Sequence, residues 1–402
     1  MSETTLGALA NAGVLSLGDG YRTRQSELTD SGYRIIRVAD VRDGRVAMDS
    51  PDFVDAAFER QIGVKAARAG DVLLTTKGTV GRVAVVPELA TRAVYSPQLC
   101  WFRVLDFGQL NSRFLSYWLQ APSFLAQASY LQGNTDMAPY ISLSDLRGSK
   151  ITLPPLSEQR AIAEVLGALD DKIAANTALA ATAARLAQIE LGAATTDGAH
   201  DLSVQEVATL ITRGITPRYV SEGDGTRVIN QKCVRDQIVS LDPSRWTDDA
   251  KVKADRLLVY GDVLVNSTGQ GTLGRVARWT LPGAVTADSH ITIVRPDPSV
   301  SDPDVIGHAI LAIEADIEAL GEGSTGQTEL SRIELGRARV LIPGAGFAVE
   351  LGAKLRGLSA RQDAARAENR TLAATRDALL PQLMSGRLRV RDAEAVASAA
   401  GA

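Results

Sequence analysis

The chain contains GTVGRVA at residues 78–84 and GTLGRVA at residues 271–277, which are 193 positions apart. Four further segments recur in the same order at offsets of 189 to 193. They begin at Ile36, Gly70, Asp145 and Asn176, and they return at Ile229, Gly261, Glu334 and Asn369. One such match would be weak evidence. Five matches in one order and near one offset indicate a tandem duplication that covers almost the whole chain.

Each copy begins with about 150 residues of short apolar runs, such as residues 72–74, 83–86 and 99–102. Glycines and prolines separate these runs, which is typical of strands joined by tight turns. Each front part ends in a strand that stops at a proline, at residues 151–154 and 340–343, and a long helical pattern follows. The sequence therefore predicts an α+β fold of two mostly β domains, each followed by a long helix.

Both helical segments repeat apolar or small residues at alternating steps of four and three, the spacing of a heptad stripe. The predicted pairing residues are Ile162, Leu166, Leu169, Ile173 and Asn176 in the first helix, and Leu351, Leu355, Leu358, Asn369 and Leu372 in the second. A single amphipathic helix could equally lie on its own domain. Two homologous stripes in one chain favour pairing of the two helices with each other, in which the asparagines specify the register at some cost in stability.

Composition places the chain among globular proteins of about two domains, with 402 residues, 45% hydrophobic and 22% charged. The net charge of −4 argues against a sequence-independent nucleic-acid binder. The two cysteines, Cys100 and Cys233, are isolated and are expected to be buried and reduced. The three histidines are dispersed, so no metal site is predicted. Neither a signal peptide nor a membrane span is recognisable, and we expect a cytoplasmic protein.

The glycine-rich blocks could be phosphate-binding loops or β-turns. A Gly-Lys-[Ser/Thr] motif and a following helical pattern are both missing, which favours turns whose glycines adopt positive φ. The polar segment inside each block differs between the copies, and polar side chains in a constant frame suit recognition of base edges. The candidate DNA-contacting residues in these segments are Thr75, Thr76 and Lys77 in the first copy, and Asn266, Ser267 and Gln270 in the second.

Two other loops are candidates for DNA contact. RGITPRY at residues 213–219 and its counterpart DGYRTR at residues 19–24 combine cations with a tyrosine after a glycine turn, which suits phosphate contact, although a solvated loop is the alternative. The candidates are Tyr21, Arg22 and Arg24, and Arg213, Thr216, Arg218 and Tyr219. The polar stretch at residues 230–232 interrupts a strand. It adds Asn230 and Lys232, with Arg37 at the matching place in the first copy, as possible base contacts.

No catalytic set is recognisable. A DNA methyltransferase needs an Asn/Asp-Pro-Pro-aromatic motif, whereas Pro154 and Pro155 lie between leucines. The segment at residues 249–251 matches the end of a nuclease motif but has no suitable upstream Pro-Asp. No Ser/His/Asp set can be assembled from the dispersed histidines. The chain is expected to be non-enzymatic.

The sequence resembles the specificity subunits of Type I restriction-modification systems over residues 1–391. The similar segments are LPPLSEQRAI at residues 153–162, LLPQLMSGRL at residues 379–388, RGITP at residues 213–217 and the two glycine blocks. The resemblance implies a target-recognition domain at 1–154, a central helical spacer at 155–196, a second target-recognition domain at 197–343 and a distal helical spacer at 344–391. It also implies that the two spacers run antiparallel and form a coiled coil with a pseudo-two-fold arrangement. An alanine-rich tail at 392–402 is expected to be disordered.

The resemblance also implies function and partners. Each domain would recognise one half of a bipartite site in double-stranded DNA, while two methyltransferase subunits and restriction-translocase subunits bind the chain. S-adenosylmethionine, ATP and magnesium would be bound by those partners and not by this chain. One departure is that the second helix begins with GAGF at residues 344–347 and lacks the Ser-Glu-Gln-Arg block.

Three alternatives stay open at this stage. The chain could be a free-standing methyltransferase or a nuclease–methylase fusion, which the missing motifs disfavour. It could be the specificity or scaffold subunit of another phage-defence methylation complex. It could also be a scaffold whose domains bind protein, an alternative that the acidic balance supports.

Overall fold

The computed structural model describes residues 2–42, 44–132, 140–196, 198–321 and 329–402. The chain divides into two compact units, which are described one at a time. The first unit comprises Met1–Ala174 and Glu368–Ala402, and the second comprises Ala175–Ala367. Each unit therefore contains one mostly β domain and one part of each long helix. Residue 197, where the second domain is predicted to begin, lies outside the described residues.

Domain 1 (residues 2–154) consists of two four-stranded sheets, a two-stranded ladder and a hairpin. The larger sheet has the order β2 (Leu15–Asp19), β11 (Leu99–Val104), β8 (Val72–Thr75), β9 (Val83–Val85). The second sheet has the order β10 (Ala93–Tyr95), β4 (Tyr33–Ile36), β7 (Phe53–Val54), β3 (Leu28–Thr29). The ladder joins β1 (Ser2–Thr5) to β12 (Lys150–Leu153), and the hairpin joins β5 (Val41–Arg42) to β6 (Arg45–Val46). The helices are α1 (Leu6–Asn11), α2 (Glu59–Ile62), α3 (Ser112–Trp118), α4 (Pro122–Gln132) and α5 (Leu143–Gly148).

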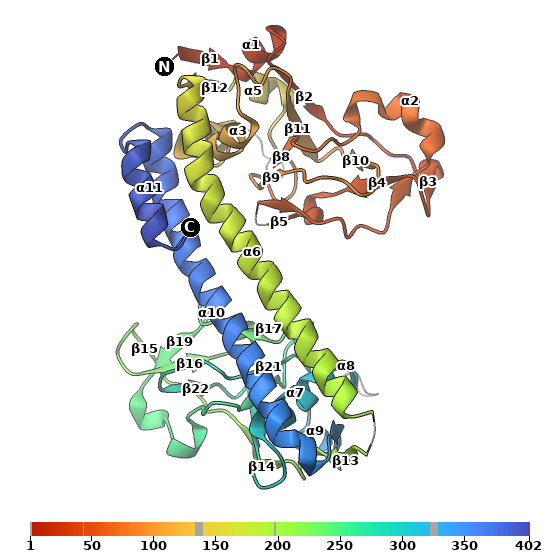
Figure 1. The fold of residues 1–402 in the computed structure, drawn as a ribbon, viewed down its shortest axis with the longest axis vertical. Helices are drawn as coiled ribbons and strands as arrows, with labels where there is room; N and C mark the ends of the chain where they lie inside the picture. Colours follow the sequence, from red (N-terminus) through yellow and green to blue (C-terminus); the bar gives the residue numbers. More distant parts are fainter. Residues whose placement is uncertain (1, 43, 133–139, 197, 322–328) are drawn as a thin grey trace. The chain divides into compact units, whose positions relative to one another are not determined.

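Domain 2 (residues 198–343) repeats this topology (Figure 1). Its larger sheet has the order β14 (Ala208–Arg213), β23 (Ile291–Pro296), β20 (Val263–Asn266), β21 (Val276–Arg278). Its second sheet has the order β22 (Val285–Ala287), β16 (Thr226–Ile229), β19 (Arg245–Thr247), β15 (Tyr219–Val220). The ladder joins β13 (His200–Ser203) to β24 (Arg339–Ile342), and the hairpin joins β17 (Val234–Arg235) to β18 (Ile238–Val239). The helices are α7 (Pro303–Ala312), α8 (Glu314–Gly321) and α9 (Arg332–Arg337).

The Gly-Asp-Val-Leu blocks have a structural role in both domains. Asp71, 2% exposed, accepts from Arg103 at 2.7 and 2.6 Å and from the Tyr95 hydroxyl at 2.6 Å. Asp262, 0% exposed, accepts from Arg295 at 2.8 Å twice. Each aspartate thus receives a bidentate guanidinium, the geometry in which an Arg–carboxylate pair is strongest. The blocks join the larger sheet to the loop before β8 or β20.

Two long helices, α6 (Leu156–Ala194) and α10 (Ala345–Met384), pack together in each unit through the predicted stripe. In the first unit one apolar cluster contains Ile162, Leu166 and Leu169 of α6 with Leu372 and Leu379 of α10, and Ile173 packs against it. In the second unit another cluster contains Ala183, Ala187 and Leu191 of α6 with Leu351, Leu355 and Leu358 of α10. Asn176 is buried, and the Asn369 amide donates to the Ile173 carbonyl at 3.2 Å.

The helices run antiparallel in the first unit. Arg376 of α10 donates to Asp170 of α6 at 2.8 Å, whereas Asn369, earlier in α10, contacts Ile173, later in α6. The predicted α+β fold, with two duplicated domains and two long helices that pack together, is confirmed.

The expectation of a disordered tail at 392–402 is wrong. Residues 390–399 form helix α11 (Val390–Ala399), and Ala393 and Ala397 on one of its faces are buried in the apolar cluster of the first unit. Small side chains spaced four apart lie on one helix face and allow close packing, which a composition-based expectation of disorder overlooks.

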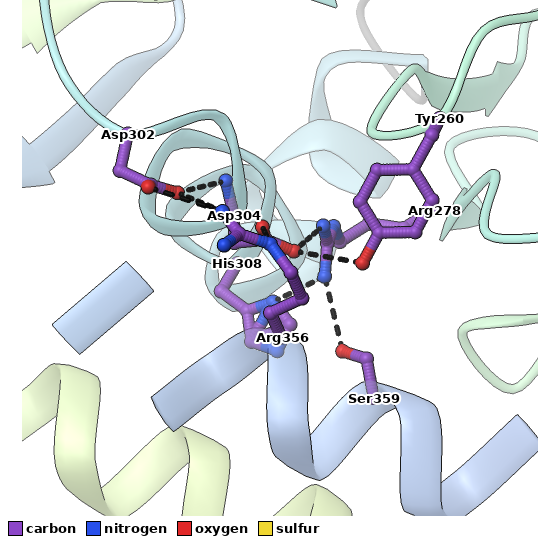
Figure 2. Close-up of polar contacts among 7 residues, drawn as sticks. All are labelled: Tyr260, Arg278, Asp302, Asp304, His308, Arg356 and Ser359. Carbon is purple, nitrogen blue, oxygen red and sulfur yellow. Dashed lines mark hydrogen bonds and ion pairs between the residues drawn. The ribbon is translucent and has the colours of Figure 1, made fainter. Parts of the chain in front are cut away.

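Each domain is joined to a long helix by an ionic contact at matching places. In the first unit Arg113 of α3 forms an ion pair with Asp171 of α6, and the Tyr117 hydroxyl donates to Asp170 at 2.6 Å. In the second unit the matching helix α7 presents Asp304 and His308 toward α10 (Figure 2). The acidic partner therefore lies on the long helix in one unit and on the domain in the other.

Figure 2 shows the contact in the second unit. Asp304, 1% exposed at its side chain, pairs with Arg278 and accepts from Arg356 of α10 at 2.8 Å. Arg278 also donates to the Ser359 hydroxyl at 3.1 Å and to Nδ1 of His308 at 3.2 Å. Because a buried carboxylate without its cation is strongly destabilising, these groups fix domain 2 on α10.

Among the described residues no helix has both the length and the apolar character that a membrane crossing requires. Cys100 and Cys233 are free and buried, and burial raises the pKa of Cys233 to about 11.

Replacing Leu166 by alanine tests the helix packing. Leu166 is 0% exposed, so Leu166→Ala removes buried methyl groups and leaves a cavity. The free energy of unfolding should fall by ~2–5 kcal/mol, measured by chemical denaturation followed by circular dichroism. The control is Leu179→Ala on the same helix, since Leu179 is 49% exposed and its loss should cost less than ~0.5 kcal/mol. Equal losses in both variants would contradict the packing.

His308 makes the stability of the second unit depend on pH. Burial, and then the neighbouring Arg278, lower the pKa of His308 from 6.5 to about 3, so the folded chain keeps this imidazole neutral. The unfolded chain binds the proton more tightly, so stability is full above pH ~6.5 and is lost as pH falls toward ~3. His308→Gln should remove part of that acid sensitivity, seen as a smaller fall in melting temperature between pH 7 and pH 4.5. An unchanged fall in melting temperature between pH 7 and pH 4.5 would show that other titratable groups determine the acid sensitivity.

Candidate nucleic-acid interface

Several loops of domain 2 meet at one edge of its larger sheet. Strand β14 ends at Arg213, β20 ends at Asn266, and β23 begins at Ile291, which pairs with Asn266. The loops that follow or precede these residues therefore emerge side by side. We call residues 213–216, 230–232, 267–272, 288–290 and Glu329 the domain 2 loop surface.

Backbone contacts connect these loops. Ser267 donates its N–H to the carbonyl of His290 at 2.9 Å, and Thr268 forms an isolated bridge with Glu329. Gly269 lies against the Gln231 amide, since a Cβ built on Gly269 would be 3.0 Å from the Gln231 nitrogen. The glycine therefore allows the 267–272 loop to approach the 230–232 segment closely.

Domain 1 has the same backbone arrangement. Thr76 donates to the carbonyl of Gln98 at 2.9 Å, and Lys77 forms an isolated bridge with Tyr140. We call residues 19–22, 37–39, 76–81, 96–98 and Tyr140 the domain 1 loop surface. Glycine is required at its edge, because a Cβ on Gly20 would lie 2.1 Å from the Ser96 carbonyl oxygen. Gly214 has the same constraint, with the Ala287 carbonyl oxygen at 2.1 Å.

The side chains on these matching backbones differ. In domain 1 the Lys77 ammonium lies 4.6 Å from the centre of the Tyr140 ring. In domain 2 the Thr268 hydroxyl lies 2.6 Å from Nδ1 of His290, and Arg213 pairs with Glu329 at 2.8 Å. A constant backbone with different polar groups is what two recognition surfaces for different sequences require.

Partial burial shifts the pKa of two charged groups at the domain 2 loop surface, Arg213 and Asp288. Burial lowers the pKa of Arg213, which also donates to the carbonyls of Leu330 at 2.8 Å and Ser289 at 3.3 Å. Burial raises the pKa of Asp288, which accepts the backbone N–H of His290 at 2.9 Å. Both groups organise the loop before β23.

The side chains of five predicted DNA contacts are buried, although Tyr21, Thr76 and Ser267 belong to segments of the loop surfaces. The five are Thr75, Thr76, Tyr21, Asn266 and Ser267, between 0% and 9% exposed. Thr75 accepts from Arg82 N–H at 2.9 Å, and Thr76 donates to the Gln98 carbonyl at 3.1 Å. Asn266 donates to the Gln231 carbonyl at 3.0 Å, and the Ser267 hydroxyl pairs with that of Thr292 at 2.6 Å. Among the described residues the Asn266 side-chain oxygen has no hydrogen-bond partner, but the other side-chain contacts named here are made within the domain, so we correct the assignment of these residues from contact residues to structural ones.

Tyr21 belongs to an apolar cluster with Tyr33 and Ile35. Burial, and then its hydrogen bond with Glu27, raise the pKa of Tyr21. The tyrosine after the glycine turn therefore packs inward in domain 1.

The other predicted residues are wholly or partly exposed. Arg22, Arg24, Thr216, Lys232 and Gln270 are exposed on or beside the loop surfaces. Arg37 and Arg218 are exposed as well, in ion pairs with Asp52 and Asp248. Lys77, Arg213 and Asn230 are partly buried, and Asn230 donates to the Pro243 carbonyl at 2.8 Å, whereas Tyr219 is 49% exposed.

The sequence analysis missed Gln98 and His290, which lie on the loop surfaces. Gln98 and His290 each stand immediately before the first apolar residue of a matching strand, β11 or β23. The repeat comparison stopped at the glycine-rich blocks before these strands and resumed only after them. Extending it through β11 and β23 could have found both residues.

Comparisons with known proteins agree with this architecture. Residues 9–184 match the family described as Type I restriction modification DNA specificity domain. The chain is 24% identical over 164 residues to the Type I restriction enzyme MjaVIII specificity subunit of Methanocaldococcus jannaschii, and 29% identical over 174 residues to the Type I restriction enzyme EcoBI specificity subunit of Escherichia coli. The matched part of the chain is therefore similar to Type I DNA specificity domains.

Each of those two alignments covers 40% of this chain, but only 38% and 33% of the respective relatives. The crystal structure of the S subunit of a Type I restriction-modification system from M. genitalium superposes on it with a TM-score of 0.60 at 15% identity. That superposition covers 95% of each chain, so the two share the whole fold.

The family-like Ser-Glu-Gln-Arg block at the start of α6 has an internal role at its glutamine. Gln159 is 1% exposed, donates to the carbonyls of Gln109 and Pro154 at 3.1 and 3.0 Å, and accepts the N–H of Asn111 at 3.0 Å. The glutamine therefore fixes the beginning of α6 on domain 1. The second long helix lacks this block, and the acidic contact of Figure 2 joins α10 to domain 2 instead.

In the part of the chain that the structure describes, no cluster of three or more histidine, cysteine or acidic side chains is arranged to hold a metal ion.

Two substitutions in adjoining parts of one loop distinguish structural from surface residues. Asn266→Ala leaves the Gln231 carbonyl without its donor and should lower the free energy of unfolding by ~1–3 kcal/mol. Gln270→Ala alters an exposed side chain and should change the free energy of unfolding by less than ~0.5 kcal/mol. Thermal unfolding of both variants measures the difference, and a stable Asn266→Ala variant would contradict the structural assignment.

Proposed function

We propose that this chain is the DNA-specificity subunit of a Type I restriction-modification complex. In this proposal it selects the sequence that the complex methylates or cleaves and performs no chemistry itself. The similarity of residues 9–184 to Type I DNA specificity domains supports the class of protein, and the dispersed histidines and missing methyltransferase motif of the sequence agree with a non-catalytic role.

The observation that supports sequence recognition is the pair of loop surfaces. The two domains share strand order, bridge positions and glycine constraints, yet differ where Lys77 and Tyr140 in one domain replace Thr268 and Glu329 in the other. Different polar groups at matching backbone positions of one edge are expected if each domain recognises its own half-site. A bipartite DNA site with two unrelated halves follows from this proposal.

In this proposal partner subunits supply the positive charge and the cofactor sites that the chain lacks. A net charge of −4 provides little neutralisation of DNA phosphates, so methyltransferase subunits would contribute much of the affinity. In our proposal S-adenosylmethionine is bound by those subunits, and ATP and magnesium by restriction-translocase subunits. Double-stranded DNA is the ligand of the two loop surfaces.

The test uses methylated-base mapping in cells that express the methyltransferase partner with and without this chain. We expect methylation at one bipartite sequence only when the chain is present. Methylation by the purified chain alone, or an unchanged methylation pattern without it, would reject the proposal.

Exchange of domain 2 tests the independence of the half-sites. Residues 201–343 are replaced by the equivalent part of a relative with a different specificity, within the β13–β24 ladder that closes the domain. One half of the methylated sequence should change and the other should stay, because the loop surface of domain 1 is untouched. Methylome mapping gives the result, and the matched control exchanges residues 2–154 instead. A change in both halves after either exchange would contradict separate recognition.

A further inference from the structure

Domain 2 has a groove beside the loop surface that the sequence analysis did not identify. It lies on the second sheet, between β15, β16 and β19, and has a volume of about 440 Å³. Its lining includes two arginines, Arg227 and Arg245, and two aromatic residues, Tyr219 and Trp246. Two carboxylates, Glu222 and Asp242, line it as well.

Both arginines are held by aromatic rings. The Arg227 guanidinium lies 4.8 Å from the centre of the Trp246 ring, and that of Arg245 lies 4.8 Å from the centre of the Tyr219 ring. Arg227 also donates to the Ser244 hydroxyl at 3.1 Å. Within the described residues neither arginine forms an ion pair, although Glu222 and Asp242 line the same groove. Stacking orders a guanidinium without neutralising it, so its remaining N–H groups and its charge stay available.

Domain 1 repeats the central part of this arrangement. Arg34 lies 4.5 Å from the centre of the Phe53 ring and donates to the carbonyl of Ser50. Arg34 and Phe53 are register partners on β4 and β7, as Arg227 and Trp246 are on β16 and β19. The stacked arginine has thus been kept in both copies, whereas the side chains of the loop surfaces have diverged.

The groove lies close to the loop surface. Strand β16, which contains Arg227, continues directly into Asn230 and Gln231, and it pairs with β22, which leads to Asp288 (Figure 1). Three residues of extended chain span ~10 Å, so Arg227 is displaced from the loops by about three base-pair steps of ~3.4 Å. A duplex lying on the loop surface would therefore bring its backbone past the groove.

We propose that the stacked arginines Arg227 and Arg245, and Arg34 in domain 1, bind the phosphate backbone of duplex DNA next to each half-site. This inference rests on the proposed function and assigns part of the affinity to a sequence-independent contact. A feature common to both domains suits a contact that is the same for every sequence, because phosphates carry no base information.

The experiment measures DNA binding by the complex of this chain with its methyltransferase partner over a range of salt concentrations. The double variant Arg227→Gln/Arg245→Gln should bind its cognate and mismatched duplexes about tenfold more weakly at low salt. The dependence of log affinity on log salt should become shallower by about one for each phosphate contact removed. Asp242→Asn removes a repelling charge from the groove and should strengthen binding to both duplexes.

The control variants separate charge from folding. Arg339→Gln changes an exposed arginine of the same unit that is ion-paired with Asp201, and it should leave affinity and salt dependence unchanged. Arg227→Lys keeps the charge without the planar stack and should keep most of the salt dependence. Melting temperatures of all variants identify any that unfold.

The outcomes distinguish the two proposals. If the wild-type complex does not bind DNA specifically, both the proposed function and the phosphate contact are rejected. If it does, and the double variant is folded but keeps full affinity and salt dependence, only the phosphate contact is rejected. Loss of discrimination between cognate and mismatched duplexes would also reject it, since that result assigns the arginines to base recognition.

Discussion

Burial of the apolar stripe along α6 and α10 is the constraint on which the structure depends. Neither helix lies wholly within one compact unit, because α6 (Leu156–Ala194) crosses the division after Ala174 and α10 (Ala345–Met384) crosses it before Glu368. Each unit therefore needs the end of a helix that begins beside the other domain. Duplication makes this possible, since two copies of one amphipathic helix provide matching stripes that bury each other in opposite directions.

The repeated parts and the diverged parts of the two domains follow different physical rules. Buried groups such as Asp71 and Asp262 must keep their cation, because an uncompensated buried carboxylate costs several kcal/mol. The domain–helix contacts have diverged in polarity, from Asp171 on the long helix of the first unit to Asp304 on the domain in the second. Exchanging the acidic and basic sides of an ion pair requires both residues to change together. This is easier for two residues that contact mainly each other than for a buried residue with several partners.

The sequence predicted the duplication, the strand-rich domains and the pairing residues of the long helices, because periodicity and repeats follow directly from side-chain burial. It identified the polar segments around Thr75 and Asn266 but not which side chains in them are exposed. Burial within a turn depends on contacts with distant segments, such as Gln98 and Gln231, that no local pattern encodes. The same limit explains α11, whose alanines are buried only because the first unit offers a surface to cover them.

An acidic protein that recognises DNA must place its cations so that its own carboxylates do not neutralise them. At the domain 2 loop surface this is only partly achieved, since Glu329 pairs with Arg213. In the groove beside it, Arg227 and Arg245 stack on Trp246 and Tyr219, and Glu222 and Asp242 line the groove without forming an ion pair with either arginine in the described part of the chain. An aromatic ring orders a guanidinium and leaves its charge in place, whereas a carboxylate orders it and cancels the charge. Stacked arginines therefore let a chain of net charge −4 present a local attraction for phosphate without becoming a general polyanion binder.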